Sequence, residues 1–337
     1  MSATIIVDAM GGDEACAVPV QSVLELCKEH QDLTVLLVGT EKDILSCIDG
    51  DLPENVRIVS SSSEIAMGDS PAKAYREKND SSIHKGIDLL VEGKGDAFFS
   101  AGKTGAVVAV SYFKSGILES ISRPALAAIS PSVDSKKLII LDLGATIEPK
   151  AENYLDFGIL GEAYRFCITG LEDSTIGILN VGEEENKGTK TVVDASELLK
   201  RSGLNYTGFI EGNRLFVDPN VDVLVTDAFT GNITLKTVEG LNEAISLMIK
   251  SKIAPPRWKR TRAFFFNKIF GEVFSQFQYN LYGTALLLGT NHLIGVGHGR
   301  SDVSAFKNAI LRLKKHAERD FLNKFKERVK HTKKLKS

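Results

Sequence analysis

Short apolar runs alternate with amphipathic helical stretches along the chain, and this alternation constrains the fold more than any other feature. Helical periodicity occurs between the runs, for example from Val18 to Lys28, from Ser81 to Glu92 and from Asp194 to Leu199. Continuous apolar strands joined through helices predict a largely parallel sheet with helices on both faces, so we expect an α/β fold. The apolar runs, each followed by glycine or a polar turn, are Thr4–Val7, Leu33–Val38, Val56–Val59, Ala97–Phe99, Leu138–Leu141, Ile176–Leu179, Gly208–Ile210 and Val221–Thr226.

The size and composition of the chain agree with a globular fold. It has 337 residues, of which 43% are apolar and 25% are charged, enough for one large domain or two modest ones. It contains no run of eighteen uncharged apolar residues, so we expect no transmembrane helix. Asp8 follows the first residue too closely for a signal peptide, which predicts a cytoplasmic protein.

The cysteines do not form a pattern typical of metal binding. The four of them, Cys16, Cys27, Cys47 and Cys167, are scattered, without a CxxC pair or a histidine at ligand spacing. We therefore expect buried thiols, no metal site and no cofactor.

Charge is distributed unevenly along the chain. The net charge is −2, but from Lys307 to Ser337 twelve Lys or Arg outnumber three acids, giving +9, so residues 1–306 carry −11. This basic end suggests an anionic partner, and a solvated helix face with a frayed end is the alternative. The basic end has no interleaved aromatic residues and no nucleic-acid-binding motif, so we expect no nucleic acid partner.

Five loops that follow predicted strands combine glycine with hydrogen-bonding side chains. Ligands of parallel sheets bind at the carboxyl ends of the strands, so these loops predict one site assembled from several segments. The loops are Asp8–Asp13, Ser100–Ala106, Asp142–Thr146, Asn180–Gly188 and Asp227–Asn232.

The loop Ser100–Ala106 is the first candidate for a phosphate site, because its glycines and the following helix can present backbone amides to an anion. It is not a Walker A loop, since Ala97 stands where that motif needs glycine, and no GxGxxG follows the first strand. No Ser, Cys or Thr nucleophile lies in a recognisable motif beside a base. We therefore expect the nucleophile to be a bound substrate such as inorganic phosphate.

Four further side chains suit such chemistry. Lys73 and Lys187 can offset phosphate charge, Asn232 can donate to a carbonyl oxygen, and His298 can transfer a proton or bind an oxyanion. Each also has a structural interpretation, as a solvated lysine, a helix cap or a structural histidine.

Eight motifs in chain order resemble the phosphate acyltransferase (PlsX) family. The resemblance runs from Asp8 to about Ile310. It implies a three-layer α/β/α fold with a mostly parallel mixed sheet, like isocitrate and isopropylmalate dehydrogenases and phosphotransacetylases. The motifs are Asp8-Ala-Met-Gly-Gly-Asp13, Ser70-Pro-Ala-Lys-Ala74, Asp80-Ser-Ser82, Ser100-Ala-Gly102 with Thr104-Gly-Ala106, Arg123-Pro-Ala125, Asn180 through Gly188, Glu239-Gly240 and His298-Gly299.

The resemblance also implies a domain organisation and an activity. A phosphate acyltransferase domain of two intertwined subdomains spans residues 1–310, and a basic C-terminal tail spans 311–337. A fatty acyl group passes from acyl-ACP (acyl carrier protein) to inorganic phosphate, and a glycerol-3-phosphate acyltransferase uses the acyl phosphate in phospholipid synthesis. The implied assembly is a homodimer, cytoplasmic and peripherally associated with an anionic membrane surface.

Carried onto this sequence, the resemblance places three residues in catalysis: Lys187 steers phosphate, and Asn232 and His298 act on the carbonyl side. Two alternatives stay open, an acyl-CoA:phosphate acyltransferase like phosphotransacetylase and a non-catalytic scaffold that binds ACP or membrane. The residues assigned to substrate and phosphate binding are Asp8, Gly11, Gly12, Lys73, Ser100, Gly102, Lys103, Thr104, Asn180, Glu183 and Asp227.

The sequence departs from the family pattern at four places. Lys103 and Thr146 stand where the family has Asn, Ala228 stands where it has Gly, and Gly283–Leu286 replaces Gly-Gly-Ala-Pro. Lys103 introduces a cation into the candidate phosphate loop, where it either strengthens phosphate binding or blocks the pocket.

One segment, 250–282, has the composition of a surface that contacts anionic membranes. Seven Lys or Arg and no acid lie between Lys250 and Lys268. An acidic carrier protein fits this segment as well, and a core or dimer-interface helix is the alternative. Apolar residues with helical spacing follow, namely Phe266, Ile269, Phe270, Val273 and Phe277.

Overall fold

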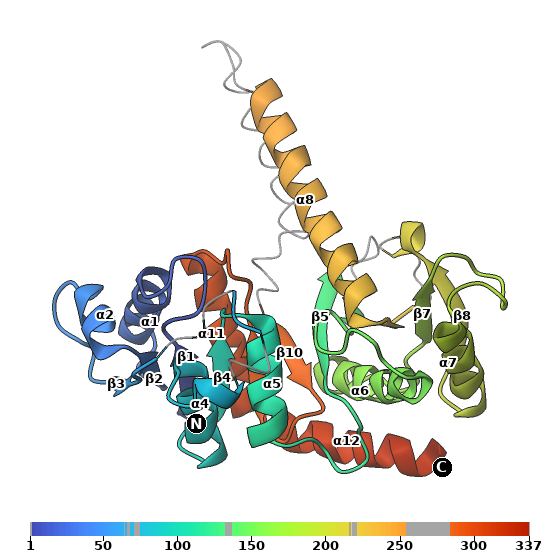
Figure 1. Ribbon diagram of the computed structural model, residues 1–337, viewed down its shortest axis with the longest axis horizontal. Coiled ribbons are helices and arrows are strands. Elements are labelled where there is room, and N and C mark those ends of the chain that lie inside the picture. The colour runs from blue at the N-terminus through green and yellow to red at the C-terminus, as the bar shows by residue number, and fades with distance from the viewer. Residues whose placement is uncertain are drawn as a thin grey trace.

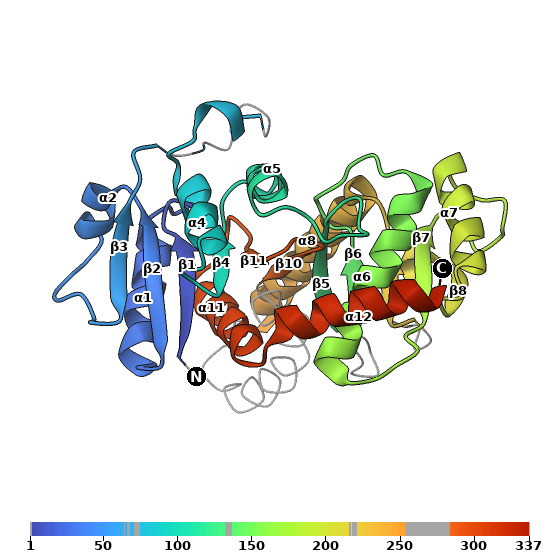
Figure 2. The same ribbon diagram turned by 90° about the horizontal axis from the view of Figure 1, so that it is seen from below.

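The computed structural model describes residues 2–63, 65, 68–70, 75–131, 137–215, 217, 221–253 and 284–336. Within this part of the chain, eleven strands form one sheet in the order β3-β2-β1-β4-β11-β10-β5-β6-β9-β7-β8 (Figures 1 and 2). Lys73, Gly283 and most of the predicted 250–282 segment lie outside the described residues.

The sheet has two parallel halves that run in opposite directions. In the first half, β3, β2, β1, β4 and β11 are parallel; in the second, β6, β9, β7 and β8 are parallel. Two antiparallel strands, β10 and β5, join the halves. The bounds are β1 Ala3–Asp8, β2 Leu33–Gly39, β3 Val56–Ser60, β4 Ala97–Ser100, β5 Ala125–Pro131, β6 Lys137–Leu141, β7 Ile176–Asn180, β8 Tyr206–Glu211, β9 Val223–Val225, β10 Ala285–Leu288 and β11 Leu293–Val296.

Helices cover both faces of this sheet, and a separate apolar core lies against each face. One core contains apolar side chains from α1, α6, α7, α11 and α12, and the other contains those from α4 and α5. The three-layer α/β/α prediction with a mostly parallel mixed sheet is confirmed. The helices are α1 Ala17–Glu29, α2 Glu41–Ser46, α4 Ser82–Val91, α5 Thr104–Lys114, α6 Ala151–Thr169, α7 Lys190–Arg201, the 3-10 helix Gly212–Arg214, α8 Ala228–Ile253, α11 Val303–Glu318 and α12 Phe321–Lys336.

The apolar spacing of the helices explains how they pack. In α4, Ile83, Ile87 and Leu90 fall at intervals of four and three residues, and all three are buried against the sheet. In α6, Gly161 permits a close approach to β9, because a Cβ there would lie 2.3 Å from a side-chain carbon of Val223. Helix α6 is therefore fixed against the second half of the sheet.

The segment predicted as a basic tail is helical and packs on the domain. Helix α12 lies along α6 (Figure 2), with Phe321, Phe325 and Val329 buried at helical spacing. Arg328 forms an ion pair with buried Glu162 of α6, and its Nε lies 3.0 Å from Oε1 of that carboxylate. The predicted division at residue 310 falls inside α11, and the frayed end is not seen, since α12 extends to Lys336.

No helix in the part of the chain that the structure describes is long and apolar enough to span a membrane.

Candidate active site

The long helix α8 connects loops that belong to the two halves of the sheet. It begins beside the loop Asp142–Thr146 of the second half, where Ala228 N donates to Thr146 O at 3.0 Å, an ordinary hydrogen-bond length. About three turns later, Glu239 of α8 reaches His298, in the loop that follows β11 of the first half. A single α-helix thus links the carboxyl ends of strands that run in opposite directions.

Asp8 and Ser100 hold the first two loops together. The Asp8 carboxylate is 1% exposed and accepts hydrogen bonds from Ser100 Oγ at 2.6 Å and from Met10 N at 2.9 Å. Ser100 Oγ in turn accepts from Gly102 N at 3.0 Å. Burial raises the pKa of Asp8, and the hydrogen bond from Ser100 is the largest opposing effect. These contacts give both side chains a role in shaping the loops.

The glycines of the same loops allow a close approach of backbone segments. A Cβ on Gly11 would lie 2.6 Å from Gly102 N and 2.8 Å from Asp8 Oδ2. Gly12 has φ +108°, a conformation that favours glycine, and Asp13 N donates to Gly299 O at 2.8 Å. Three loops therefore meet at this edge: the loops after β1, β4 and β11.

The amino end of α5 faces the second half of the sheet. Thr104, the first residue of α5, has its methyl group 3.5 Å from the position that a Cβ on Gly144 would occupy. Lys103 occupies the N-cap position, and its ammonium donates to the backbone oxygen of Asp69. An α-helix leaves its first amides without intrahelical partners, and this property makes the amino end of α5 a candidate anion site.

Asp142 organises the loop that faces α5. Its buried carboxylate accepts four hydrogen bonds from backbone amides. Oδ1 accepts from Leu126 N at 2.9 Å, from Gly144 N at 3.1 Å and from Ala145 N at 3.0 Å, and Oδ2 accepts from Thr146 N at 2.6 Å. Burial raises the pKa of Asp142 to about 6 against the effect of these donors. The sequence placed this loop at the site, but the backbone-ordering role of Asp142 was missed.

Asp227 caps α8 and thereby positions Asn232. Its carboxylate accepts from Thr230 N at 2.8 Å and from Thr230 Oγ1 at 2.7 Å. Gly231 lies against the Asp142 loop, since a Cβ there would be 2.1 Å from Asp142 O. Asn232 follows in the next position and is exposed, so its amide can reach a ligand beside that loop.

His298 and Glu239 form a histidine–carboxylate pair. Nδ1 of His298 accepts from Arg300 N at 3.1 Å, which places the ring proton of the neutral imidazole on Nε2. That nitrogen lies 3.5 Å from Glu239 Oε2, while Glu239 Oε1 is buried and has no hydrogen-bond partner in the described residues. The sequence indicated His298, but it gave Glu239 only as part of a motif.

The loop Asn180–Gly188 is ordered by its own contacts. The Asn180 side chain donates to Gly182 O at 3.1 Å and to Lys187 O at 3.0 Å, and Glu183 pairs with Arg214 at 2.6 Å. Lys187 is exposed. Since β7 neighbours β9, this loop lies one strand beyond the Asp227 loop, and no described hydrogen bond or ion pair joins it to the other site loops.

Comparisons with known proteins show the family of the chain. Residues 3–324 match the family model described as "Fatty acid synthesis protein". Two relatives are named phosphate acyltransferase. The protein from Campylobacter fetus subsp. fetus (strain 82-40) is 35% identical, and the match covers 97% of this chain and 98% of the relative. The protein from Desulfitobacterium hafniense (strain DSM 10664 / DCB-2) is 36% identical, and the match covers 96% of this chain and 97% of the relative. The chain belongs to the phosphate acyltransferase family. The predicted family, the enzyme class and the transfer of an acyl group to phosphate are thus confirmed for this phosphate acyltransferase.

Solved structures similar to this chain support the fold. A phosphotransacetylase from Streptococcus pyogenes has a TM-score of 0.58 at 16% identity, covering 94% of each chain. The EutD phosphotransacetylase from Staphylococcus aureus has a TM-score of 0.56 at 14% identity, also covering 94% of each chain. At these identities the likeness concerns the fold alone.

Proposed function

We propose that the chain takes its acyl group from the thioester of an acyl carrier protein and that the site between the two halves of the sheet carries out the transfer to inorganic phosphate. The membership of the phosphate acyltransferase family supports the reaction class. The contact between His298 and Glu239 carries the assignment of the site, because it joins the loop after β11 to the helix that starts beside the Asp142 loop.

Phosphate is proposed to bind at the amino end of α5, against the first amides of this helix. Asp8 is too buried and too fully hydrogen bonded to hold an anion, so its role is to keep the loop before α5 in place. Gly11, Gly12 and Gly102 act through the close packing that they permit. Lys73 and Lys187 remain proposed phosphate ligands, and unchanged kcat/KM after Lys187→Ala would discard the second of them.

The reaction then follows an addition–elimination course. A phosphate oxygen attacks the thioester carbon, the new O–C bond forms, and the carbonyl oxygen becomes an oxyanion. Asn232 and the Nε2–H of His298 donate to this oxyanion, as preorganised donors do in acyl transfer. The oxyanion collapses, the C–S bond breaks, and the carrier leaves as a thiolate that takes a proton from solvent.

Glu239 positions the imidazole in this mechanism. At 3.5 Å the contact with His298 is longer than a good hydrogen bond, so the Nε2–H can be donated to substrate. The hydrogen bond from Arg300 N to Nδ1 holds the ring, and the Glu239 carboxylate limits how far the ring turns. Removing one oxyanion donor typically lowers kcat by about 10²–10³-fold. We expect this loss for His298→Ala, a smaller loss for Glu239→Gln, and none for the control His331→Ala on the exposed face of α12.

The assay is phosphate-dependent release of free thiol from a long-chain acyl-ACP, with the acyl phosphate trapped by hydroxylamine. Turnover with acyl-ACP that falls in His298→Ala supports the proposal. Turnover restricted to acyl-CoA would identify a phosphotransacetylase-like donor instead, and binding of acyl-ACP without turnover would indicate a scaffold.

We also propose that the chain forms a homodimer through α8 and works at an anionic membrane surface, where a glycerol-3-phosphate acyltransferase consumes the product. Helix α8 projects from the body of the molecule (Figure 1) and ends at Ile253, within the basic segment of the sequence. Its exposed apolar side chains support the dimer; they are Phe229, Ile233, Leu241, Leu247 and Met248. A monomeric mass in light scattering would contradict the dimer. A variant with reversed charge at Arg257, Lys259 and Arg260 tests the membrane contact. If it sedimented with anionic liposomes as the wild type does, the membrane contact would be contradicted.

A further inference from the structure

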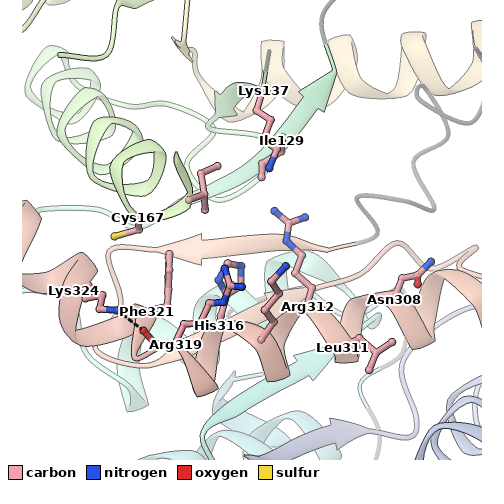
Figure 3. Close-up of a pocket in the computed structure, with 12 residues that line it drawn as sticks. Ile129, Lys137, Cys167, Asn308, Leu311, Arg312, His316, Arg319, Phe321 and Lys324 are labelled. Atoms are coloured by element: carbon pink, nitrogen blue, oxygen red, sulfur yellow. Dashed lines mark hydrogen bonds between the residues drawn. The ribbon is translucent and has the colours of Figure 1, made fainter. Parts of the chain in front are cut away.

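A basic pocket of about 630 Å³ lies away from the candidate active site. It is bordered by α11, the start of α12, the end of α6 and the strands β5 and β6 (Figure 3). These helices contribute to the core on one face of the sheet, whereas α5 of the candidate site contributes to the core on the other. Ligand pockets commonly measure about 300–1,000 Å³, so the pocket can hold a small molecule.

The pocket carries a strong excess of positive charge. Five Lys or Arg line it, and none of its described lining residues is acidic: the five are Lys137, Arg312, Lys315, Arg319 and Lys324. Three acids close by in the sequence have partners of their own: Glu318 pairs with Lys314 at 2.8 Å, Asp320 accepts from Asn323 Nδ2 at 2.7 Å, and Glu162 pairs with Arg328. In the part of the chain that the structure describes, no carboxylate pairs with Lys137, Lys315 or Arg319.

Several of these groups are held in place before any ligand binds. Nη2 of Arg312 donates to Tyr164 Oη at 2.7 Å, and Nζ of Lys324 donates to the backbone oxygen of Arg319 at 2.9 Å. The His316 ring lies 4.5 Å from the Phe321 ring between centroids. Fixed cations of this kind lose little conformational entropy on binding an anion.

The largely buried ring of His316 lies among the cations of the pocket. Burial, followed by the neighbouring Arg312, Lys315 and Arg319, lowers the pKa of His316 to about 3. Its Nε2 is buried and has no hydrogen-bond partner within the described residues. A neutral imidazole and a surrounding set of cations are suited to a ligand that carries several negative charges.

We infer that this pocket binds a multivalent phosphate with an apolar portion, at a site separate from the acyl-transfer site. Lys and Arg are the side chains that recognise phosphate groups, and Lys137 of β6 and Arg312 of α11 point into the same space (Figure 3). Ile129, Leu311 and Phe321 offer apolar surface beside them. The inference does not depend on the proposed function.

The pocket has a direct structural connection to the candidate site. Lys137 is the first residue of β6, and Asp142 follows the last residue of the same strand. Five strand residues span about 16 Å, so a ligand at Lys137 would lie at the opposite end of a single rigid element from the Asp142 loop.

Isothermal titration calorimetry at low salt tests the inference, with inorganic tripolyphosphate and adenosine triphosphate as probes. The pocket variant is Lys137→Gln, Lys315→Gln and Arg319→Gln. Its control removes the same charge at exposed lysines elsewhere, Lys28→Gln, Lys42→Gln and Lys190→Gln. We expect the pocket variant to bind both probes at least about tenfold more weakly and the control to bind like the wild type. We also expect adenosine triphosphate to bind more tightly than tripolyphosphate.

Three results would overturn the inference. These are no binding to the wild type, equal affinities for the wild type and the pocket variant, and equal weakening in the pocket variant and its control. If adenosine triphosphate bound no more tightly than tripolyphosphate, the inference that the ligand has an apolar portion would be wrong. If the triple variant does not fold by circular dichroism, Lys315→Gln alone, on the exposed side of α11, replaces it.

Alkylation of Cys167 provides a second readout that is local to the pocket. Cys167 lines the pocket and is partly accessible, and Cys47 is partly accessible at the far end of the sheet. Either probe should slow iodoacetamide labelling of Cys167, measured by peptide mass spectrometry, and leave Cys47 unchanged. Unchanged labelling of Cys167 at a saturating probe concentration would place any bound phosphate at another site.

Discussion

Replacing Gly11 by alanine should separate the effect of loop packing from the effect of removing a functional side chain. The new Cβ would lie 2.6 Å from Gly102 N, whereas ordinary van der Waals contact begins at 3.4 Å, so the loops after β1 and β4 must move apart by about 0.8 Å. The nearest atoms include backbone atoms of the neighbouring loop, so a side-chain rotation cannot relieve the clash.

The expected cost of this overpacking is about 1–3 kcal/mol of unfolding free energy. The catalytic cost should be larger, because the displaced loop carries the amino end of α5, and a misplacement of about 1 Å can lower the rate about 10²-fold. Gly11→Ala should therefore reduce kcat for acyl phosphate formation by about two orders of magnitude. The protein should still unfold cooperatively in urea.

Gly212→Ala is the matched control, because a Cβ at Gly212 meets no atom of the described residues within 4 Å and the residue has no positive φ. Its kcat and its urea midpoint should equal those of the wild type. If Gly11→Ala kept both the wild-type kcat and the wild-type midpoint, the loops would not be coupled by this contact, and the reasoning from loop packing to phosphate binding would be refuted.

Three further predictions concern Asp142, Glu162 and Lys103. Burial raises the pKa of Asp142 in the folded protein to about 6. Between about pH 4 and pH 6 the folded state therefore binds one more proton than the unfolded state, and the free energy of unfolding falls by about 3 kcal/mol as the pH rises through that range. Urea titrations at several pH values should show this slope in the wild type and not in Asp142→Asn; parallel curves would contradict it. Glu162→Ala should lower the free energy of unfolding by about 3–5 kcal/mol, because it leaves Arg328 without its buried partner, whereas Glu327→Ala, on the exposed side of α12, should change it by less than about 0.5 kcal/mol. Lys103→Asn should leave the KM for phosphate unchanged within about twofold, because the ammonium is engaged with a backbone oxygen outside the loop, and a clear rise in KM would show that Lys103 contacts phosphate.

The apolar runs of the sequence predicted most of the sheet because buried parallel strands are continuously apolar. Each of the eight predicted runs overlaps one strand of the structure. The strands that were not predicted have ambiguous signals: β5 is rich in alanine, which has low strand propensity, and a glycine interrupts β11. The short apolar run of β10 cannot be told from a buried helix segment by periodicity alone. Periodicity carries no information on strand direction, so the opposite orientation of the two halves could not be predicted.

The candidate site was predicted by its loops better than by its individual side chains. Glycine followed by polar residues marked the loops after β1, β4, β6 and β9, which the structure gathers around α5 and the start of α8. Sequence alone does not distinguish a carboxylate that binds a ligand from one that orders a loop. Asp8 and Asp227, predicted to bind substrate, accept hydrogen bonds that order their own loops. Glu239 has no local signal, because its partner His298 lies 59 residues later and meets it only through the fold.

The course of α8 restricts how this chain can vary in length. Between Asp227 and Glu239 the helix spans twelve residues, about 18 Å, and this length sets the separation between the Asp142 loop and the His298 loop. One inserted residue would turn Glu239 by about 100° away from the imidazole, and an inserted full turn would restore its direction but displace it by about 5.4 Å. Insertions and deletions should therefore occur in the surface loops of related chains and be absent from this stretch of helix. The length of this stretch fixes the distance between the two parts of the site.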